Sequence, residues 1–217
     1  VQQDDDTHIY GANEFISSIP ITSVVNLLDP PAPAEILQAA SKLKFRDLII
    51  VTIMINRDRV TDQTWIYIPD PDVPFGRIHE PKNWSHIMAP AGKTHLVTEY
   101  FCFNSDIIWS QTDEELTLLT VKHLQKLGFI QPDEVLDSVV LRIPKAYPLF
   151  EVNYMKHSGQ VSDYLEGFEN LYPIGRAGKF QYYNTDHAME SGIDAAEKII
   201  AGHKFSNGSR LQELQPF

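Results

Sequence analysis

A strand, a glycine-containing turn and a helix follow one another near the carboxyl end of the sequence, and this order restricts the fold more than any other feature. Apolar residues over 171–174 predict a short strand, Gly175 and Gly178 predict a turn, and a helix is expected to start near Thr185 or Asp186. Such a unit presents unpaired backbone N–H groups and the positive end of a helix dipole to an anion or an electron-rich carbonyl. Glycines at the turn let a ligand lie against bare backbone. The same residues also fit an ordinary strand–turn–helix connection.

Two short motifs in this stretch resemble the C-terminal flavin-contacting segment of FAD proteins in the amine oxidase, protoporphyrinogen oxidase and UDP-galactopyranose mutase superfamily. A motif of type N-L-Y-x-x-G corresponds to residues 170–175. A helix motif of type S-G-x-x-A-A corresponds to residues 191–196. The resemblance extends over roughly residues 13–201 and is most specific over 175–196.

One residue separates this sequence from many redox members of the superfamily. They have Asp after the first glycine of the turn, whereas this chain has Arg176. The order Gly175, Arg176, Tyr182 and Asp186 is closer to the mutase branch. Asn184 departs from that branch, because mutases usually have an acidic residue there.

The resemblance implies that the full-length protein binds FAD through this stretch. A guanidinium beside a helix N-terminus stabilises negative charge, so Arg176 suits a flavin phosphate or the N1–C2=O edge of an anionic reduced flavin. A salt bridge between Arg176 and a nearby carboxylate is the alternative, and Asp186 and Ser191 also fit simple helix-start residues. The expected cofactor-binding residues are Gly175, Arg176, Ala177, Gly178, Asp186, His187 and Ala188.

Three further residues are expected to bind substrate. In the mutase branch a segment similar to R-I-x-E-x-K supplies an arginine for a sugar-nucleotide diphosphate, and Arg77, Glu80 and Lys82 fit this pattern. An arginine fork can hold phosphate oxygens bidentately. Tyr147 resembles a tyrosine that lines the substrate cavity, and Tyr182 resembles one that contacts the diphosphate. Without the resemblance, Arg77 reads as part of a loop before a solvated charged edge, and Tyr147 as a strand-edge tyrosine.

Composition narrows the class of protein. The 217 residues are 43% hydrophobic, which predicts a folded globular protein. A net charge of −11 argues against nucleic acid and anionic membrane surfaces as partners. Cys102 is the single cysteine, it is expected to be buried, and it fits a reducing, cytoplasmic location. The histidines show no metal-binding spacing, and no apolar run is long enough for membrane insertion.

The remaining sequence predicts an α+β fold with a mixed or antiparallel sheet. A helix is expected from Thr112, because Thr112 and Glu115 form a capping box and Gly128 fits the position after the helix. His123 lies on the apolar stripe of that helix and is expected to be a core or boundary residue. Further helix and strand predictions are a helix over 33–43 and strands over 15–19, 48–55, 64–68, 93–103 and 138–143, the last ended by Pro144.

The expected domain organisation follows from the resemblance. Residues 1–20 would be a strand segment of an FAD-binding domain, 21–150 a substrate-binding domain, 151–203 the closing segment of the FAD-binding domain, and 204–217 a tail. The sequence contains no GxGxxG motif. We therefore expect the N-terminal half of the same protein to carry that motif as a partner, and the chain by itself to be inactive.

Three functions remain open. The first is a mutase-like flavoenzyme acting on a nucleotide-linked or other anionic sugar in cell-surface polysaccharide (LPS) biosynthesis. The second is an FAD-dependent amine or protoporphyrinogen-type oxidase. The third is a non-catalytic binding domain that keeps the fold without FAD. The sequence assigns no catalytic residue.

Overall fold

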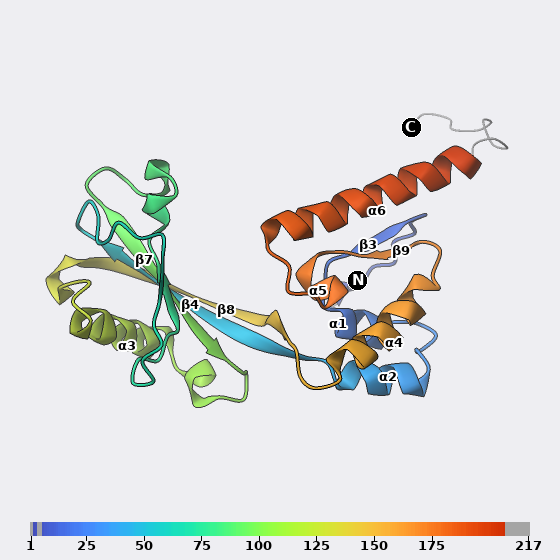
Figure 1. Ribbon diagram of the computed structural model, residues 1–217, viewed down its shortest axis with the longest axis horizontal. Coiled ribbons are helices and arrows are strands. Elements are labelled where there is room, and N and C mark those ends of the chain that lie inside the picture. Colours follow the sequence, from blue (N-terminus) through green and yellow to red (C-terminus); the bar gives the residue numbers. More distant parts are fainter. Residues whose placement is uncertain (1, 4–5, 207–217) are drawn as a thin grey trace. The chain divides into compact units, whose positions relative to one another are not determined.

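The computed structural model describes residues 2–3 and 6–206 and divides into two compact units (Figure 1). One unit comprises residues 1–44 and 147–217, and the other comprises residues 45–146. The assignment of the predicted segments 1–20, 21–150 and 151–203 to flavin-binding and substrate-binding domains stays a prediction. The two units are described separately below.

The unit of residues 45–146 is built on a five-stranded sheet with one face covered by a helix. The strands lie in the order β5-β6-β7-β4-β8, and the paired strands β5–β6, β6–β7 and β4–β7 are antiparallel. This confirms the predicted α+β class. The bounds are β4 (Lys44–Ile55), β5 (Trp65–Tyr67), β6 (Arg77–His79), β7 (Thr94–Cys102) and β8 (Val135–Leu149), with helix α3 (Asp113–Lys126) and 3-10 turns η1 (Pro81–Asn83), η2 (His86–Met88), η3 (Ile107–Ser110) and η4 (Pro132–Glu134).

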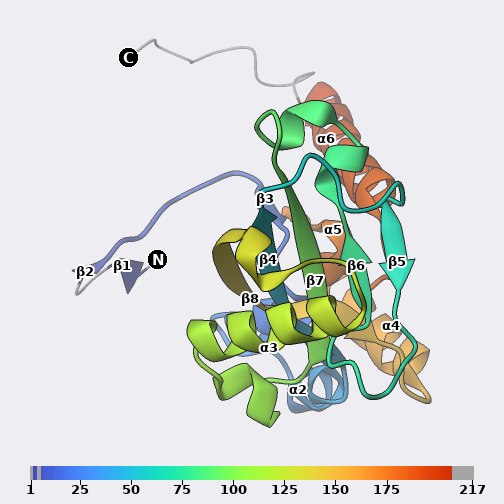
Figure 2. The same cartoon turned by 90° about the vertical axis from the view of Figure 1, so that its left-hand side faces the viewer.

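Strand β4 explains the apolar run of the sequence, because it lies between β7 and β8 inside the sheet. Its alternate residues Ile49, Val51, Ile53 and Ile55 are fully buried in the core beneath α3. Figure 2 shows α3 crossing that face of the sheet. A strand that is covered on one face and paired on both sides has little need of polar residues, so the predicted buried central strand is confirmed.

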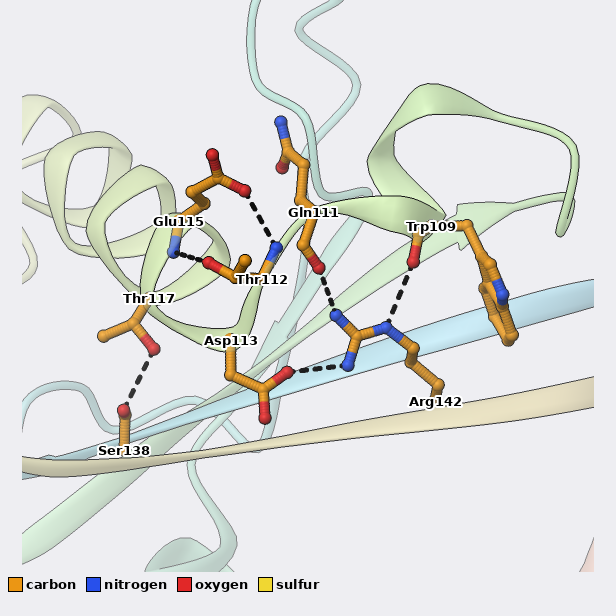
Figure 3. Close-up of polar contacts among 8 residues, drawn as sticks. All are labelled: Trp109, Gln111, Thr112, Asp113, Glu115, Thr117, Ser138 and Arg142. Atoms are coloured by element: carbon orange, nitrogen blue, oxygen red, sulfur yellow. Dashed lines mark hydrogen bonds and ion pairs between the residues drawn. The ribbon is translucent and has the colours of Figure 1, made fainter.

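Helix α3 begins as the sequence predicts. The Thr112 hydroxyl accepts the Glu115 N–H at 3.2 Å, and the Glu115 carboxylate accepts the Thr112 N–H at 2.8 Å (Figure 3). Arg142 of β8 donates to the Asp113 carboxylate at 2.7 Å and to the Trp109 carbonyl at 3.1 Å, so it ties the start of the helix to the edge of the sheet. Leu127 ends the helix and Gly128 follows with φ +79°, as the glycine signal predicts.

The prediction that Pro144 ends the last strand of this unit is wrong. Strand β8 continues through Pro144 to Leu149. It is the outer strand of the sheet as far as the structure describes it, and a residue without an N–H group is tolerated there because an outer strand has fewer ladder bonds to lose.

The other unit surrounds a two-stranded parallel sheet of β3 (Phe15–Ser17) and β9 (Leu171–Pro173), with Phe15 opposite Leu171. Figure 1 shows α6 on one side of this pair and α1, α2 and α4 on the other. The helices are α1 (Ile21–Asn26), α2 (Ala34–Ser41), α4 (Tyr154–Glu166), α5 (Gly175–Lys179) and α6 (Thr185–Ser206), and the short pair β1 (Gln2–Gln3) and β2 (Asp6–Thr7) precedes them.

Helices α1 and α4 were not predicted. The buried positions of α4 are Ser158, Val161 and Leu165, a stripe too narrow and too polar to give a clear helical period. Helix α6 also extends to Ser206, past Lys204, where the tail was expected to start. The rest of the predicted tail, residues 207–217, lies outside the described residues.

Two expectations about single residues are confirmed. Cys102 is buried, and burial together with Asp47 and Asp106 raises the pKa of its thiol to about 11. His123 is half-buried, and its ring lies 6.3 Å from that of Phe75 at an angle of 82°, so it is a boundary residue of α3. Among residues 2–3 and 6–206, no helix combines the length and the apolar character that a bilayer crossing requires.

Candidate functional site

The turn predicted after β9 is a short helix, α5, and its first N–H group is already bonded. Gly175 has φ +71°, which favours glycine, and its N–H donates to the Ser191 hydroxyl at 2.8 Å. The same hydroxyl donates to the Ala188 carbonyl at 2.7 Å. The buried Ser191 hydroxyl therefore links α5 to α6 through these two hydrogen bonds. Ser191 is not a helix-start residue, because α6 begins at Thr185. The N–H group of Gly175, which was expected to be open to a ligand, is bonded to Ser191.

Gly178 is required by packing between backbones. A Cβ atom at this position would lie 2.9 Å from the Ser17 carbonyl oxygen and 3.5 Å from the Ile19 carbonyl oxygen. Real Cβ atoms do not approach backbone atoms so closely, so only glycine lets α5 lie against the end of β3. Sequence reasoning had connected this glycine with a ligand, and the structure shows contact with the chain itself.

Arg176 brings together three of the predicted site residues. Its guanidinium carbon lies 4.7 Å from the centre of the Tyr147 ring and 5.3 Å from the centre of the Tyr182 ring. The two tyrosine rings are 5.8 Å apart and nearly parallel, at 26°. Its Nε donates to the Tyr183 carbonyl at 2.6 Å, which fixes the direction of the side chain. We call Arg176, Tyr147 and Tyr182 the arginine–tyrosine cluster.

The arginine–tyrosine cluster carries a positive charge that the described part of the chain does not neutralise by contact. Among residues 8–202, whose side chains the structure describes, no carboxylate forms an ion pair with Arg176. The salt-bridge alternative is therefore not realised in the described residues. Tyr182 is 57% exposed, so the cluster lies at the surface of its unit. A cation stacked on aromatic rings at a surface can hold an anionic group of a ligand.

A layer of aromatic rings supports the cluster from below. Phe180 is fully buried, and Phe150 stacks on Tyr154 with ring centres 4.2 Å apart. Phe150 also lies 6.4 Å from Tyr182. Rings fixed in this way limit the conformations available to Tyr182, so the cluster is preorganised.

The other predicted cofactor residues lie in the first turn of α6. The Asn184 carbonyl accepts the Ala188 N–H at 3.0 Å, and the Asn184 N–H points to His187 Nδ1 at 3.4 Å. His187 stacks on Tyr183, with ring centres 5.7 Å apart. Asp186 is exposed and lies 3.3 Å from His187 Nδ1, a pair that is ionic only when the histidine is protonated.

A cleft of about 460 Å³ runs along α6 and β9 within the same unit. Its wall includes Tyr183, His187 and Ser191 near the start of α6, and Tyr172 of β9. The predicted cofactor residue His187 therefore lines a concave surface. Ala177 and Gly178 are not part of this wall as described.

Arg77 lies in the unit of residues 45–146, and its guanidinium forms an ion pair with a carboxylate. It pairs with Glu99, which also lies 3.3 Å from His79 Nε2. Its guanidinium carbon is 4.6 Å from the Trp65 ring centre. Burial alone would raise the pKa of Glu99, but the hydrogen bonds from His79 and Arg77 outweigh it and hold the pKa below its ordinary value of 4.5. A diphosphate bound to Arg77 would have to compete with this carboxylate.

Glu80 and Lys82, which follow Arg77 in the predicted motif, hold loops in place. The fully buried Glu80 carboxylate accepts the N–H groups of Val60 and Thr61 at 3.0 and 2.8 Å. The Lys82 ammonium donates to the Asp58 carboxylate at 2.8 Å. The structure thus gives both residues an internal role.

Sequence reasoning missed the aromatic and histidine side chains around Arg77. Trp65 lies against the Arg77 guanidinium and stacks on His79 with ring centres 4.9 Å apart, and the Trp84 ring lies 5.4 Å from His79. The alternation in T-W-I-Y-I was a usable signal, because it places Trp65 and Tyr67 on one face of a strand. Among the described residues, no three His, Cys, Asp or Glu side chains are placed to hold a metal ion.

The fold is similar to those of several solved structures. A crystal structure of reduced UDP-galactopyranose mutase superposes with a TM-score of 0.77 over 91% of this chain and 43% of its own, at 18% identity. A protein assigned as a protoporphyrinogen oxidase from Exiguobacterium sp. 255-15 gives a TM-score of 0.59 over 76% and 36% of the two chains, at 21% identity. The PF1083 protein from Pyrococcus furiosus gives 0.53 over 87% and 41%, at 14% identity.

These similarities confirm the predicted resemblance at the level of the fold. The chain spans less than half the length of each of these three structures. Neither the protein-family models nor the curated proteins gave a match to the sequence.

Proposed function

We propose that this chain is the substrate domain and the closing cofactor-contact segment of an FAD-dependent enzyme. The single observation that supports this most is the arginine–tyrosine cluster. It holds a cation without a carboxylate partner among the described residues, next to the first turn of α6. The mutase-like and oxidase-like folds of the neighbours are in keeping with the proposal.

The residues present fit FAD in the proposed role. Bound FAD would supply an isoalloxazine ring that accepts and returns an electron pair. Arg176 would donate hydrogen bonds to a flavin phosphate or to the N1–C2=O edge, where negative charge develops on reduction. The Tyr182 hydroxyl would donate to a neighbouring anionic oxygen. The proposed cofactor contacts remain Gly175, Arg176, Ala177, Gly178, Asp186, His187 and Ala188, with Gly175 and Gly178 acting through the shape of α5.

For the substrate we propose a nucleotide-linked or other anionic sugar, used in cell-surface polysaccharide (LPS) synthesis. The positive arginine–tyrosine cluster supports an anionic group, and Tyr147 and Tyr182 would orient it. Arg77 is retained as a proposed substrate residue, but the Glu99 pair makes it a weaker anion ligand than Arg176. Amine or protoporphyrinogen-type oxidase chemistry is the second candidate, and the fold of the second neighbour favours it.

The proposal requires a partner segment. FAD-binding folds of this kind place the ADP part on a strand–GxGxxG–helix unit, and the described chain has none. We propose that an N-terminal half of the same protein supplies it, and that this chain by itself is inactive.

Replacing Arg176 with Ala in the full-length protein should weaken FAD binding by about tenfold to a hundredfold, the range expected for one lost charge-assisted hydrogen bond. The FAD affinity of Arg176→Lys should lie between those of the wild type and Arg176→Ala, because lysine keeps the positive charge and lacks the planar guanidinium. The measurement is flavin released per mole of purified protein, together with the dissociation constant from flavin titration.

Lys156→Ala is the matched control, because Lys156 is an exposed cation of α4 in the same unit. Its flavin content should equal that of the wild type. Equal flavin affinity of the wild type and Arg176→Ala would remove Arg176 from the cofactor site. A colourless, folded wild-type protein would favour the non-catalytic binding domain.

A further inference from the structure

One face of the sheet in residues 45–146 carries the aromatic and charged side chains that the proposed cofactor contacts do not use. The register pairs Trp65 with His79 and Tyr67 with Arg77, and Arg77 in turn with Glu99 on β7. Cross-strand partners lie on the same face, so all five side chains belong to the face opposite α3. Trp65 is 43% exposed and Trp84, which follows η1, is 49% exposed.

The ionic part of this face is internally compensated. The Glu99 carboxylate accepts hydrogen bonds from both Arg77 and His79, and only 6% of its side-chain surface is exposed. A buried carboxylate with two such partners stays ionised. Because the Glu99 carboxylate neutralises the Arg77 guanidinium, this face has little net charge to attract a phosphate.

The other nitrogen of His79, Nδ1, has no hydrogen-bond partner in the part of the chain that the structure describes. In the neutral tautomer that carries its proton on Nε2 and donates it to Glu99, Nδ1 is a hydrogen-bond acceptor. Nδ1 is buried, and no hydrogen-bond partner for it exists among the described residues. A buried acceptor without a donor is unfavourable, and a ligand that offers an O–H or N–H group would satisfy it.

Two half-exposed indole rings pack against the imidazole ring of His79. The Trp65 ring stacks on His79 with centres 4.9 Å apart, and the Trp84 ring lies 5.4 Å from His79. Trp84 also meets Trp65 edge to face at 5.1 Å. A ligand that donates to Nδ1 would therefore lie beside these indole rings and could stack on one of them.

We propose that Trp65, His79 and Trp84 form a subsite for a neutral sugar ring. The C–H face of the ring would stack on an indole, and one hydroxyl would donate to His79 Nδ1. Arg77 and Glu99 act as positioning residues that hold His79 and Trp65. This places a binding site for a neutral sugar ring on residues 45–146, and it rests on the proposed function of this unit as a substrate domain.

The test is tryptophan fluorescence of the full-length protein during titration with two probes, a methyl glycoside of a neutral hexose and inorganic pyrophosphate. We expect saturable quenching by the glycoside and none by pyrophosphate. The quenching should disappear in Trp65→Ala. His79→Phe keeps a ring stacked on Trp65 but removes the acceptor, so the glycoside should bind about tenfold more weakly. Trp109→Phe is the control and should keep the response, because Trp109 packs against the core.

Three results would overturn the subsite: no saturable glycoside response, a response that survives both Trp65→Ala and His79→Phe, or pyrophosphate quenching that Arg77→Gln abolishes. Near-ultraviolet circular dichroism of each variant checks that the Trp84 environment is retained. Flavin content of the same preparations separates this proposal from the proposed function. A flavin-free protein that binds the glycoside would support the subsite and contradict the proposed FAD function. A flavin-loaded protein that does not respond to the glycoside would contradict the subsite and support the FAD function.

Discussion

Replacing Glu80 with Ala should lower the free energy of unfolding by about 3–5 kcal/mol, the largest effect that we expect from a single substitution. The Glu80 side chain is fully buried and accepts hydrogen bonds from the N–H groups of Val60 and Thr61 and from the Thr94 hydroxyl, the last at 2.6 Å. The Asn83 amide approaches it at 3.5 Å. Removal of the carboxylate leaves these donors buried without an acceptor, so the loss exceeds that of one hydrogen bond.

Thermal unfolding monitored by circular dichroism measures this effect, and a decrease in Tm of roughly 10 °C is expected for a chain of this size. Glu80→Gln should be less harmful, because the amide keeps one acceptor oxygen. Glu197→Ala is the control at an exposed acidic position of α6 and should change the free energy of unfolding by less than about 0.5 kcal/mol. A loss below about 1 kcal/mol in Glu80→Ala would show that the loops do not depend on this carboxylate.

Gly178→Ala should destabilise the other unit by about 1–3 kcal/mol, although alanine is the better helix former. The added Cβ would lie 2.9 Å from the Ser17 carbonyl oxygen, and neither α5 nor β3 can move away without breaking its own hydrogen bonds. Because α5 carries Arg176, the displacement should also weaken flavin binding in the full-length protein.

Gly159→Ala provides a matched comparison, since Gly159 lies inside α4 and a Cβ there would meet no atom within 4 Å. This substitution should stabilise the protein by about 0.5–1 kcal/mol. Denaturant unfolding of the two variants side by side tests the contrast. Equal effects of the two substitutions would mean that α5 is not packed against the Ser17 backbone.

The elements that were predicted correctly have signals contained within a few consecutive residues. The Thr112–Glu115 capping box and Gly128 fix both ends of α3, and the apolar run in β4 identifies an interior strand. The residues that hold such elements are neighbours in the sequence, so the sequence suffices. The fold class followed from the order of these elements and was confirmed.

The errors concern properties set by residues far apart in the sequence. Pro144 was expected to end a strand, and only the position of β8 at the outside of the sheet makes a proline harmless there. The role of Gly178 depends on Ser17, and the role of Arg77 depends on Glu99. A motif that resembles a family identifies the type of residue at a position, but it does not identify which other residue or ligand the side chain contacts.

The candidate site was predicted in part for the same reason. The sequence named Arg176, Tyr147 and Tyr182 separately, and the structure brings the three side chains together from β8, α5 and the segment before α6. Ser191 illustrates the remaining gap. Its hydrogen bond with Gly175 depends on the packing of α6 against α5, and no pattern of neighbouring residues in the sequence predicts it.

The central claim is that the arginine–tyrosine cluster serves a bound flavin. The most direct measurement is the absorbance spectrum and extracted cofactor of the intact gene product, purified without added flavin. We predict a yellow protein that releases FAD in near-stoichiometric amount, and a marked loss of FAD in Arg176→Ala. A well-folded, colourless protein that also fails to take up added FAD would contradict the account.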